Sequence, residues 1–208
     1  EKESHEEFIR SKLGKNICPE FFYFKDAPTI VKRRYVNMNL SKLFEVYFYS
    51  DKFCPEYIDN DVCLWLEKNT AKFDVVVVPD FGNGFMSAGM IQKLCKHARF
   101  LAVNTQVNSG NRGYHSISQY SRADFVSLNT PEVRVATHDR HDSVENLAKK
   151  IIYQLEAKYL AVTLGGDGAI LLNKSPEIIY RTPALSAKVL DRIGAGDTFL
   201  SLTALCLG

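Results

Sequence analysis

The sequence predicts an α/β fold, in which a mostly parallel sheet is covered by helices on both faces and a small antiparallel hairpin comes first. Apolar strands alternate with amphipathic helices from about residue 74 onward, and strands that are separated by helices pair in parallel. Earlier, two segments rich in β-branched and aromatic residues flank a short polar connection, which indicates a hairpin. The chain of 208 residues is long enough for one sizeable core.

The predicted elements follow one another without a linker or an internal repeat. The hairpin strands are expected over 29–36 and 43–49, and the α/β core begins with the strand DVVVVP at 74–79, an apolar run typical of a strand buried on both faces. We therefore place a small lid at about 28–50 and the core at about 56–208. The remaining elements are a helix at about 87–97, strands at 100–103 and 125–128, a helix at about 143–157, strands at 159–164 and 169–173, and a last helix that continues to about 205.

Composition limits the classes of partner and compartment. Lys and Arg number 26 against 24 Asp and Glu, so charge gives no reason to expect nucleic acid or an anionic membrane as partner. No apolar run approaches the ~20 residues that span a bilayer, and the first residues are acidic rather than signal-like. The five cysteines are scattered and lack metal-ligand spacing, which favours reduced thiols. We expect a soluble, cytoplasmic protein.

The strongest motif is DRIGAGDTF, residues 191–199, which leads into the last apolar helix. Gly194, Ala195 and Gly196 let backbone N–H groups converge on an anion at a helix N-terminus, where the helix dipole favours negative charge. Asp197 lies one turn into that end, where it can take a proton from a hydroxyl that attacks a bound phosphate. The alternative is a glycine turn with an Asp cap.

The whole DxxGAGD pattern resembles the C-terminal signature of the ribokinase-like (PfkB) carbohydrate kinases. The resemblance implies a ribokinase-like, doubly wound fold and phosphoryl transfer from ATP to a sugar hydroxyl with Mg²⁺. It also implies that Asp197 is the general base and that Gly194 to Gly196 form the anion hole. By the same resemblance Asp191 lies close to the nucleotide and to a monovalent cation.

A second glycine-rich motif, TLGGDGA at 163–169, joins one predicted strand to the next. Glycines at the end of a parallel strand let the backbone approach a nucleotide closely, whereas an Asp-Gly pair is equally typical of a hairpin turn. Its place before the DRIGAGD segment resembles the nucleotide-binding loop of the family. No GKS or GKT follows, so the segment is not a P-loop. The candidate ATP contacts here are Thr163, Gly165, Gly166 and Gly168.

The NTPE segment, residues 129–132, follows a predicted strand and starts a helix. Asn129 and Glu132 lie within one helical turn, so both can reach the water shell of a Mg²⁺ ion at the strand end. An Asn cap with Pro and Glu in the first turn is a common helix start and explains the same residues. The two interpretations are compatible, because the family has an NxxE motif for Mg²⁺ and phosphate here.

The hairpin opens with PTIVKRR, residues 28–34, in which Lys32 and Arg34 point to the same side of a strand. Two cations on one face suit a sugar phosphate, although a charged edge that blocks aggregation is the everyday explanation. The PTxxKxR pattern resembles the lid of the heptose-phosphate kinases, the kinase half of the enzymes of ADP-heptose and lipopolysaccharide precursor synthesis. That resemblance implies heptose 7-phosphate as substrate, a homodimer formed through the lid, and possible fusion to a nucleotidyltransferase domain.

The DFGNG segment, residues 80–84, comes directly after the first core strand and resembles the DYxxG segment of the same kinases. The resemblance implies that Asp80 lies near the phosphoryl-transfer centre on the substrate side. An Asp that closes a strand and starts a turn is the ordinary interpretation, and neither excludes the other.

The sequence also departs from the family pattern. After the strand at 100–103 the family usually has Asp-Pro and then a lysine, whereas this chain has Asn104-Thr105-Gln106. Arg112 and His115 either replace the lost contacts or belong to a solvated loop. The resemblance covers about 8–208, and we expect a partial kinase domain without the family's opening strands and final helices. A non-catalytic sugar- or nucleotide-binding module of a larger nucleotidyltransferase enzyme is therefore the rival hypothesis.

Overall fold

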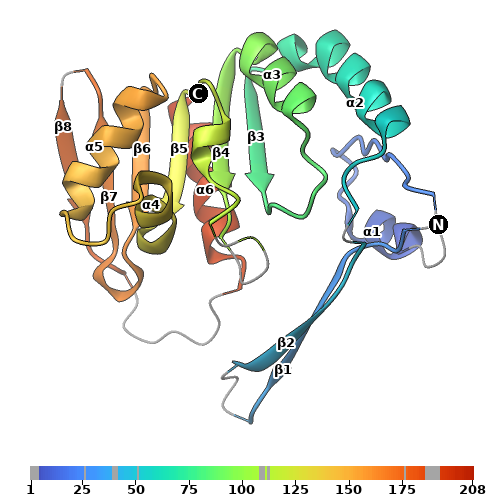
Figure 1. Ribbon diagram of the computed structural model, residues 1–208, viewed down its shortest axis with the longest axis horizontal. Helices are drawn as coiled ribbons and strands as arrows, with labels where there is room; N and C mark the ends of the chain where they lie inside the picture. Colours follow the sequence, from blue (N-terminus) through green and yellow to red (C-terminus); the bar gives the residue numbers. More distant parts are fainter. Residues whose placement is uncertain are drawn as a thin grey trace. The chain divides into compact units, whose positions relative to one another are not determined.

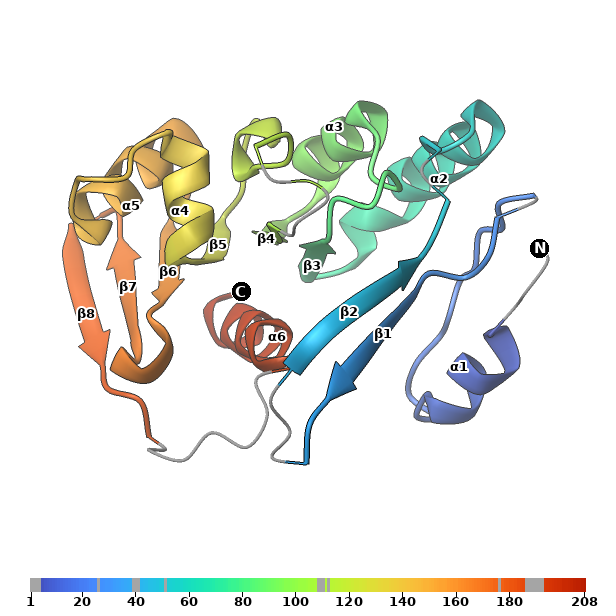
Figure 2. The ribbon, with the colours of Figure 1, turned by 60° about the horizontal axis from the view of Figure 1, so that its bottom comes forward.

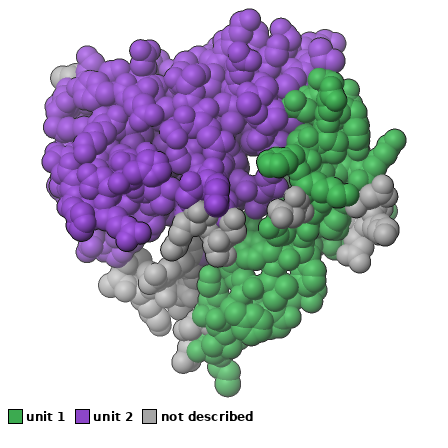
Figure 3. All heavy atoms as spheres, viewed as in Figure 1, with its two compact units in different colours: residues 1–62 green, residues 63–208 purple. Residues whose placement is uncertain are grey.

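The computed structural model describes residues 5–25, 27–38, 42–50, 52–107, 111, 113–175, 177–185 and 193–208. The chain divides into two compact units, Glu1–Val62 and Cys63–Gly208, which Figure 3 colours separately. Helix α2 (Glu56–Asn69) crosses the boundary between them. Each unit is described by itself.

The first unit contains a short helix and a two-stranded antiparallel sheet (Figure 2). Helix α1 spans Glu6–Lys12, and strands β1 (Val31–Val36) and β2 (Lys42–Phe48) form the hairpin. These strands confirm the predicted hairpin, with ends that differ by one or two residues. The register pairs Arg34 with Glu45 and Tyr35 with Phe44, so one face is charged and the other aromatic.

The second unit is built on a six-stranded sheet with the strands in sequence order (Figure 1). The first four strands are parallel and the last two are antiparallel to their neighbours, which confirms the mostly parallel sheet. The strands are β3 (Val75–Asp80), β4 (Phe100–Thr105), β5 (Phe125–Asn129), β6 (Tyr159–Thr163), β7 (Ala169–Asn173) and β8 (Ile178–Thr182), and the helices are α3 (Ala88–His97), α4 (Thr130–Thr137), α5 (Val144–Gln154) and α6 (Ala195–Leu207).

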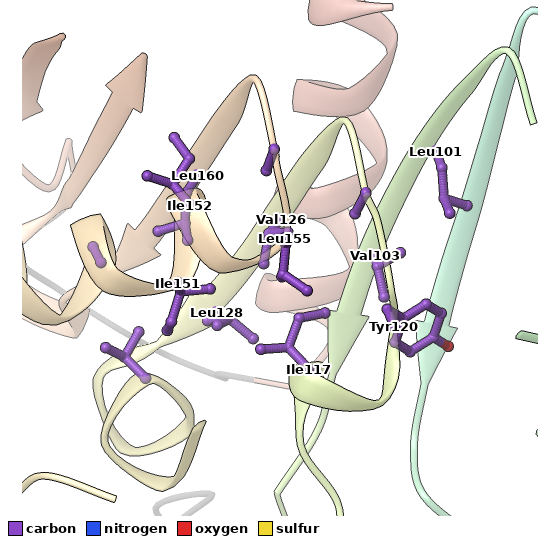
Figure 4. Close-up of a cluster of buried hydrophobic side chains, with 14 of the residues drawn as sticks. Leu101, Val103, Ile117, Tyr120, Val126, Leu128, Ile151, Ile152, Leu155 and Leu160 are labelled. Carbon is purple, nitrogen blue, oxygen red and sulfur yellow. The ribbon is translucent and has the colours of Figure 1, made fainter. Parts of the chain in front are cut away.

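Helices cover both faces of the sheet because the parallel strands are apolar on both sides. On β4, Leu101 and Val103 point into the main core with residues of α3 and α5, part of which is drawn in Figure 4. Phe100 and Ala102 face the other way, into a smaller cluster with Leu200 and Ala204 of α6. The predicted doubly wound arrangement, with helices on both faces, is thus confirmed.

Helix α6 runs antiparallel to the strands that it covers. Its C-terminal neighbour Gly208 packs against Val75 and Phe100, which are the first residues of β3 and β4. A helix of 13 residues is about 20 Å long, which matches a strand of six residues. The N-terminus of α6 therefore lies at the C-terminal edge of the parallel strands.

Helix α2 and strand β8 were not among the predicted elements. Helix α2 buries only Ile58 and Val62, which is too sparse an apolar pattern to stand out in a polar segment. Strand β8 is mostly exposed and lacks the apolar run that marks the inner strands.

The described residues add two negative findings. No helix within them combines the length and the apolar character that crossing a membrane requires. The five cysteines, all within the described ranges, form no disulfide bond.

The turn between β6 and β7 yields a stability prediction. Gly168 has φ +88°, and a Cβ there would collide with the carbonyl oxygen of Thr182, so Gly168→Ala is expected to lower the free energy of unfolding by about 2–3 kcal/mol. Gly166→Ala is the matched control, because its Cβ would meet nothing within 4 Å, and it should cost less than about 1 kcal/mol. Urea unfolding of both variants measures the difference, and equal losses would contradict the packing role of Gly168.

Candidate active site

Four parallel strands end in polar residues at one edge of the sheet. Asp80 closes β3 beside Thr105 of β4, and Asn129 closes β5 beside Thr163 of β6. The N-terminus of α6, which packs against β3, β4 and β5, lies at the same edge. The structure thus brings together the motifs at Asp80, Asn129, Thr163 and Asp197, as ligand sites in such sheets require.

The start of α6 has the features of an anion site. Its N-cap is Gly194 with φ +76°, and no side chain among the described residues caps the helix there. A Cβ on Gly194 or Gly196 would meet no atom of the described residues within 4 Å, so these residues leave the space beside this backbone open. Asp197 lies in the first turn and is half-buried, so it is not the Asp cap of the alternative interpretation. Free N–H groups, the helix dipole and a nearby carboxylate remain available for chemistry.

The glycine-rich turn after β6 serves two purposes. Strands β6 and β7 pair antiparallel around it, and Leu164 N donates to Gly168 O at 2.8 Å, so the hairpin-turn interpretation is confirmed. Gly168 is required by packing against β8. In contrast, a Cβ on Gly165 or Gly166 would meet nothing within 4 Å, which leaves backbone that a ligand can approach.

Asn129 and Glu132 form a reciprocal cap at the start of α4. The Asn129 side chain accepts from Glu132 N at 2.9 Å, and Glu132 Oε2 accepts from Asn129 N at 2.8 Å. This arrangement is a capping box with Pro131 in the first turn. The predicted helix start is confirmed, and any metal role of these residues must coexist with it.

The Glu132 carboxylate also holds the end of β4. Val107 N donates to Oε1, and Asn104 Nδ2 donates to Oε2, both at 3.3 Å, while Asn104 Nδ2 also donates to Ser127 O at 2.8 Å. Glu132 is only 4% exposed, and burial raises the pKa of its carboxyl group against the opposing effect of these N–H donors. With its oxygens so occupied, Glu132 suits contact with a metal through water rather than direct coordination.

Asp80 is buried at the end of β3. Tyr120 donates to Oδ2 at 2.9 Å, and Gly82 N donates to Oδ1 at 3.1 Å. Burial and then the neighbouring Asp80 raise the pKa of the Tyr120 hydroxyl far above its usual range, so this hydroxyl stays a donor. His115 lies 3.4 Å from Oδ1 and is therefore packed inside rather than in a solvated loop. Arg112 lies outside the described residues.

The charged face of the hairpin carries the two predicted cations. Lys32 and Arg34 share this face with Glu45 and Tyr47. Arg34 donates to Glu45 at 2.8 Å, and the Lys32 ammonium lies 5.3 Å from the centre of the Tyr47 ring. Hydrogen bonds from Tyr47, Lys42 and Arg34 lower the pKa of Glu45 to about 2. Both cations belong to the first unit.

An apolar hollow of about 260 Å³ lies between β7, β8 and α6. It reaches the same sheet edge through Ala169 and Thr182, the first residue of β7 and the last of β8. Phe199, two residues after Asp197, forms part of its wall together with Leu171 and Tyr180. This hollow adjoins the start of α6, and no sequence motif indicated it.

A model described as pfkB family carbohydrate kinase matches residues 90–207, more than half of the chain. The chain belongs to this family. Among curated proteins it is similar to "Bifunctional protein HldE" from Campylobacter jejuni subsp. doylei, at 26% identity over 94% of the chain and 41% of that protein. The protein of the same name from Nitrobacter hamburgensis is 31% identical over 64% of the chain and 27% of its own length. The chain thus spans less than half of the curated relatives it matches.

Solved structures of similar fold include two kinases. Phosphofructokinase-2 from Escherichia coli in complex with potassium superposes with a TM-score of 0.61 at 17% identity, over 79% of this chain and 53% of that one. Ribokinase from Thermotoga maritima gives 0.60 at 18% identity, over 83% and 54%. At these identities the likeness establishes the fold alone.

Sequence reasoning missed the side chains that surround the two buried carboxylates. Tyr120 and Asn104 lie 40 and 28 residues from their partners Asp80 and Glu132, and no local motif marks either. Asp191, a predicted nucleotide contact, lies outside the described residues.

Removal of the buried Glu132 carboxylate should be costly. Glu132→Ala leaves three N–H donors without an acceptor and is expected to lower the free energy of unfolding by about 3 kcal/mol. The control is Glu145→Ala in the first turn of α5, where the glutamate pairs with exposed Arg181 and the loss should be about 0–1 kcal/mol. Chemical denaturation measures the free energy of unfolding of both variants. A loss in the Glu132 variant no larger than in the Glu145 variant would refute the structural role of the Glu132 carboxylate.

Proposed function

We propose that this chain supplies the phosphoryl-transfer centre of an ATP-dependent carbohydrate kinase, whose acceptor is a hydroxyl of a sugar or sugar phosphate. The observation that carries the proposal is the uncapped N-terminus of α6, with Asp197 in its first turn, at the C-terminal edge of the sheet. Membership of the pfkB family supports it. The expected site of action is the cytoplasm.

In the proposed reaction Asp197 acts as general base. Its carboxylate takes the proton of the acceptor hydroxyl while the hydroxyl oxygen bonds to the γ-phosphorus of ATP, and the bond from that phosphorus to the β–γ bridging oxygen breaks to release ADP. The backbone N–H groups of Gly194, Ala195 and Gly196, with the dipole of α6, stabilise the charge on the transferred group. Catalysis then rests on positioning and on fixed partial charges.

The nucleotide is proposed to lie along the glycine-rich turn after β6. Gly165 and Gly166 leave open space in front of their backbone, and Thr163 ends the preceding strand. Gly168 holds the turn in shape, and Asp191 remains a proposed contact on sequence grounds. A monovalent cation beside Asp191 belongs to the same proposal, which the potassium complex of the Escherichia coli neighbour supports by analogy of fold.

Asn129 and Glu132 suit contact with the water shell of Mg²⁺ rather than direct coordination of the ion. Within the described ranges no group of three or more His, Cys, Asp or Glu side chains is placed to hold a metal ion. Mg²⁺ in phosphoryl-transfer sites is held largely by substrate phosphates and water, so Asn129 and Glu132 would contact its water shell. The ion would neutralise charge on the phosphates.

The proposed acceptor is a phosphorylated sugar, with heptose 7-phosphate as the first candidate. Lys32 and Arg34 provide two cations on one hairpin face for the phosphate group, although Arg34 is shared with Glu45. Asp80 serves the substrate side from the end of β3. The resemblance of the hairpin to the lid of heptose-phosphate kinases supports this choice.

A second candidate function is a non-catalytic sugar- or nucleotide-binding module of a larger enzyme. The matched relatives are named bifunctional, and the chain spans 41% of one of them, which favours a fused second domain, in our proposal a nucleotidyltransferase. Calorimetry with Mg²⁺ and a non-hydrolysable ATP analogue, followed by an assay of ADP release with sugar phosphates, separates the two. Nucleotide binding without turnover in the intact protein would favour the module.

The general-base assignment predicts the effect of one substitution. Asp197→Asn should lower kcat by about 10²–10⁴-fold because proton transfer is lost, while nucleotide affinity measured by calorimetry changes little. Asp139→Asn, on the turn between α4 and α5, is the matched control and should retain the parent rate. Near-normal turnover of the Asp197 variant would exclude Asp197 as the base.

We also propose that the hairpin pairs with a second copy of the chain. Its aromatic face exposes Tyr35, Phe44 and Phe48, and the first two rings stack at 4.4 Å. Replacement of Tyr35 and Phe44 by Ser should convert a dimer into a monomer, because an exposed apolar face drives association. Light scattering measures the mass, with Lys52→Ser as a surface control. A parent protein that is already monomeric would disprove this pairing.

A further inference from the structure

A buried polar cluster joins the end of β3 to the segment that precedes β5. Asp80, His115, Tyr120 and Asn111 are 3%, 7%, 1% and 7% exposed. Buried polar side chains persist when their hydrogen bonds are made, so the partners of each atom show what the cluster holds. The described parts of the cluster come from the turn after β3 and from the segment between β4 and β5.

Every oxygen of Asp80 has a donor. Oδ1 accepts from Gly82 N and Oδ2 from Tyr120, while the main-chain oxygen accepts from Gln106 N at 2.8 Å. His115 Nε2 lies 3.2 Å from the same main-chain oxygen, and its Nδ1 lies 3.0 Å from the Gln119 amide. With Nε2 as donor, Nδ1 accepts from Gln119, and the chain of hydrogen bonds is complete.

The turn after Asp80 is held from a second side. Asn111 Nδ2 donates to Phe81 O at 3.1 Å and to Gln106 O at 3.0 Å. Gly82 has φ +64°, and a Cβ there would collide with Asn111 and lie 2.7 Å from the His115 ring. The turn therefore fits against the cluster without room for a side chain at Gly82.

The ring of Tyr120 fixes the cluster to the hydrophobic core. It lies beside Val103 and Ile117, with its hydroxyl oxygen directed away from them and toward β3 (Figure 4). The hydroxyl reaches Asp80, so one side chain connects the core under β4 to the carboxylate at the end of β3. The Asp80 carboxylate therefore accepts its hydrogen bonds from the protein.

The tip of the turn differs from Asp80 in its hydrogen bonding. Asn83 lies between Gly82 and Gly84, both with positive φ, and it is half-buried. Among the described residues its side chain has no hydrogen-bond partner. A primary amide both donates and accepts, which matches the two roles of a sugar hydroxyl.

We propose that Asp80 is a positioning residue, itself held by Tyr120 and lying beside His115, which holds the turn 81–84 through Gly82 N. We propose further that Asn83 at the tip of this turn binds a hydroxyl of the acceptor sugar. The turn follows β3 at the sheet edge where α6 begins, so it lies at the same edge as the helix start that carries Asp197. The inference deepens the proposed kinase function and rests on it.

The test compares Tyr120→Phe with Asp124→Asn. Asp124 is also a buried aspartate, but it precedes β5 at the opposite edge of the sheet, where it accepts from Leu101 N and Arg122. Both substitutions should lower the equilibrium ratio of folded to unfolded protein by a similar factor, about 5–30-fold. Only Tyr120→Phe should speed hydrogen exchange at the Gly82 amide, measured by NMR without any ligand.

The kinetic arm uses heptose 7-phosphate, with fructose 6-phosphate as second acceptor. Asn83→Ala should raise KM for the acceptor about 10-fold, from one lost hydrogen bond, with KM for ATP and the thermal midpoint unchanged. Tyr120→Phe should also raise the acceptor KM without changing the ATP KM, and Asp124→Asn should change neither. Equal kinetic effects of Tyr120→Phe and Asp124→Asn, or an unchanged acceptor KM in Asn83→Ala, would overturn the proposal.

The two proposals fail separately. A protein without kinase turnover disproves the proposed function, whereas the Gly82 exchange rate still decides whether Asp80 holds the turn. In that case saturation-transfer NMR with heptose 7-phosphate decides the role of Asn83, since loss of the sugar signal in Asn83→Ala supports the contact and an unchanged signal refutes it.

Discussion

The parallel pairing of β3 to β6 is the constraint on which the candidate site depends. Because parallel strands end at the same edge, their last residues collect there whatever their separation in sequence. Helix α6 lies on the face of the sheet opposite to α3 and α5, as Figure 1 shows, and it runs antiparallel to the strands. Its N-terminal N–H groups are thereby brought to the edge where strands end in Asp80 and Asn129.

Asp80, Glu132 and Asp197, three carboxylates at this edge, differ in their surroundings. Asp80 and Glu132 are buried and saturated with donors, and each connects its strand end to the segment after β4. Asp197 is half-buried at an uncapped helix end. Burial and hydrogen bonding thus separate positioning groups from a proposed reacting group, although all three carry the same functional group.

The sequence was informative wherever the signal was local. Apolar runs located β3 to β7, and the glycines near Asp197 indicated an open helix start. The buried state of Asp80 was not predictable, because its partner Tyr120 is 40 residues away and only the fold brings the two together. Similarly, the NTPE pattern indicated the cap, while the contacts of Glu132 with Val107 and Asn104 depend on strand order.

The capping box at Asn129 has a consequence for how the edge assembles. A helix start normally forms from residues adjacent in sequence, but the Glu132 carboxylate here also accepts from Val107 and Asn104 of another strand end. The hydrogen bonds of the first turn of α4 are therefore complete only when β4 lies beside β5. A local element thus depends on a contact between residues about 25 positions apart in the sequence. We therefore expect the sheet edge to form cooperatively rather than strand by strand.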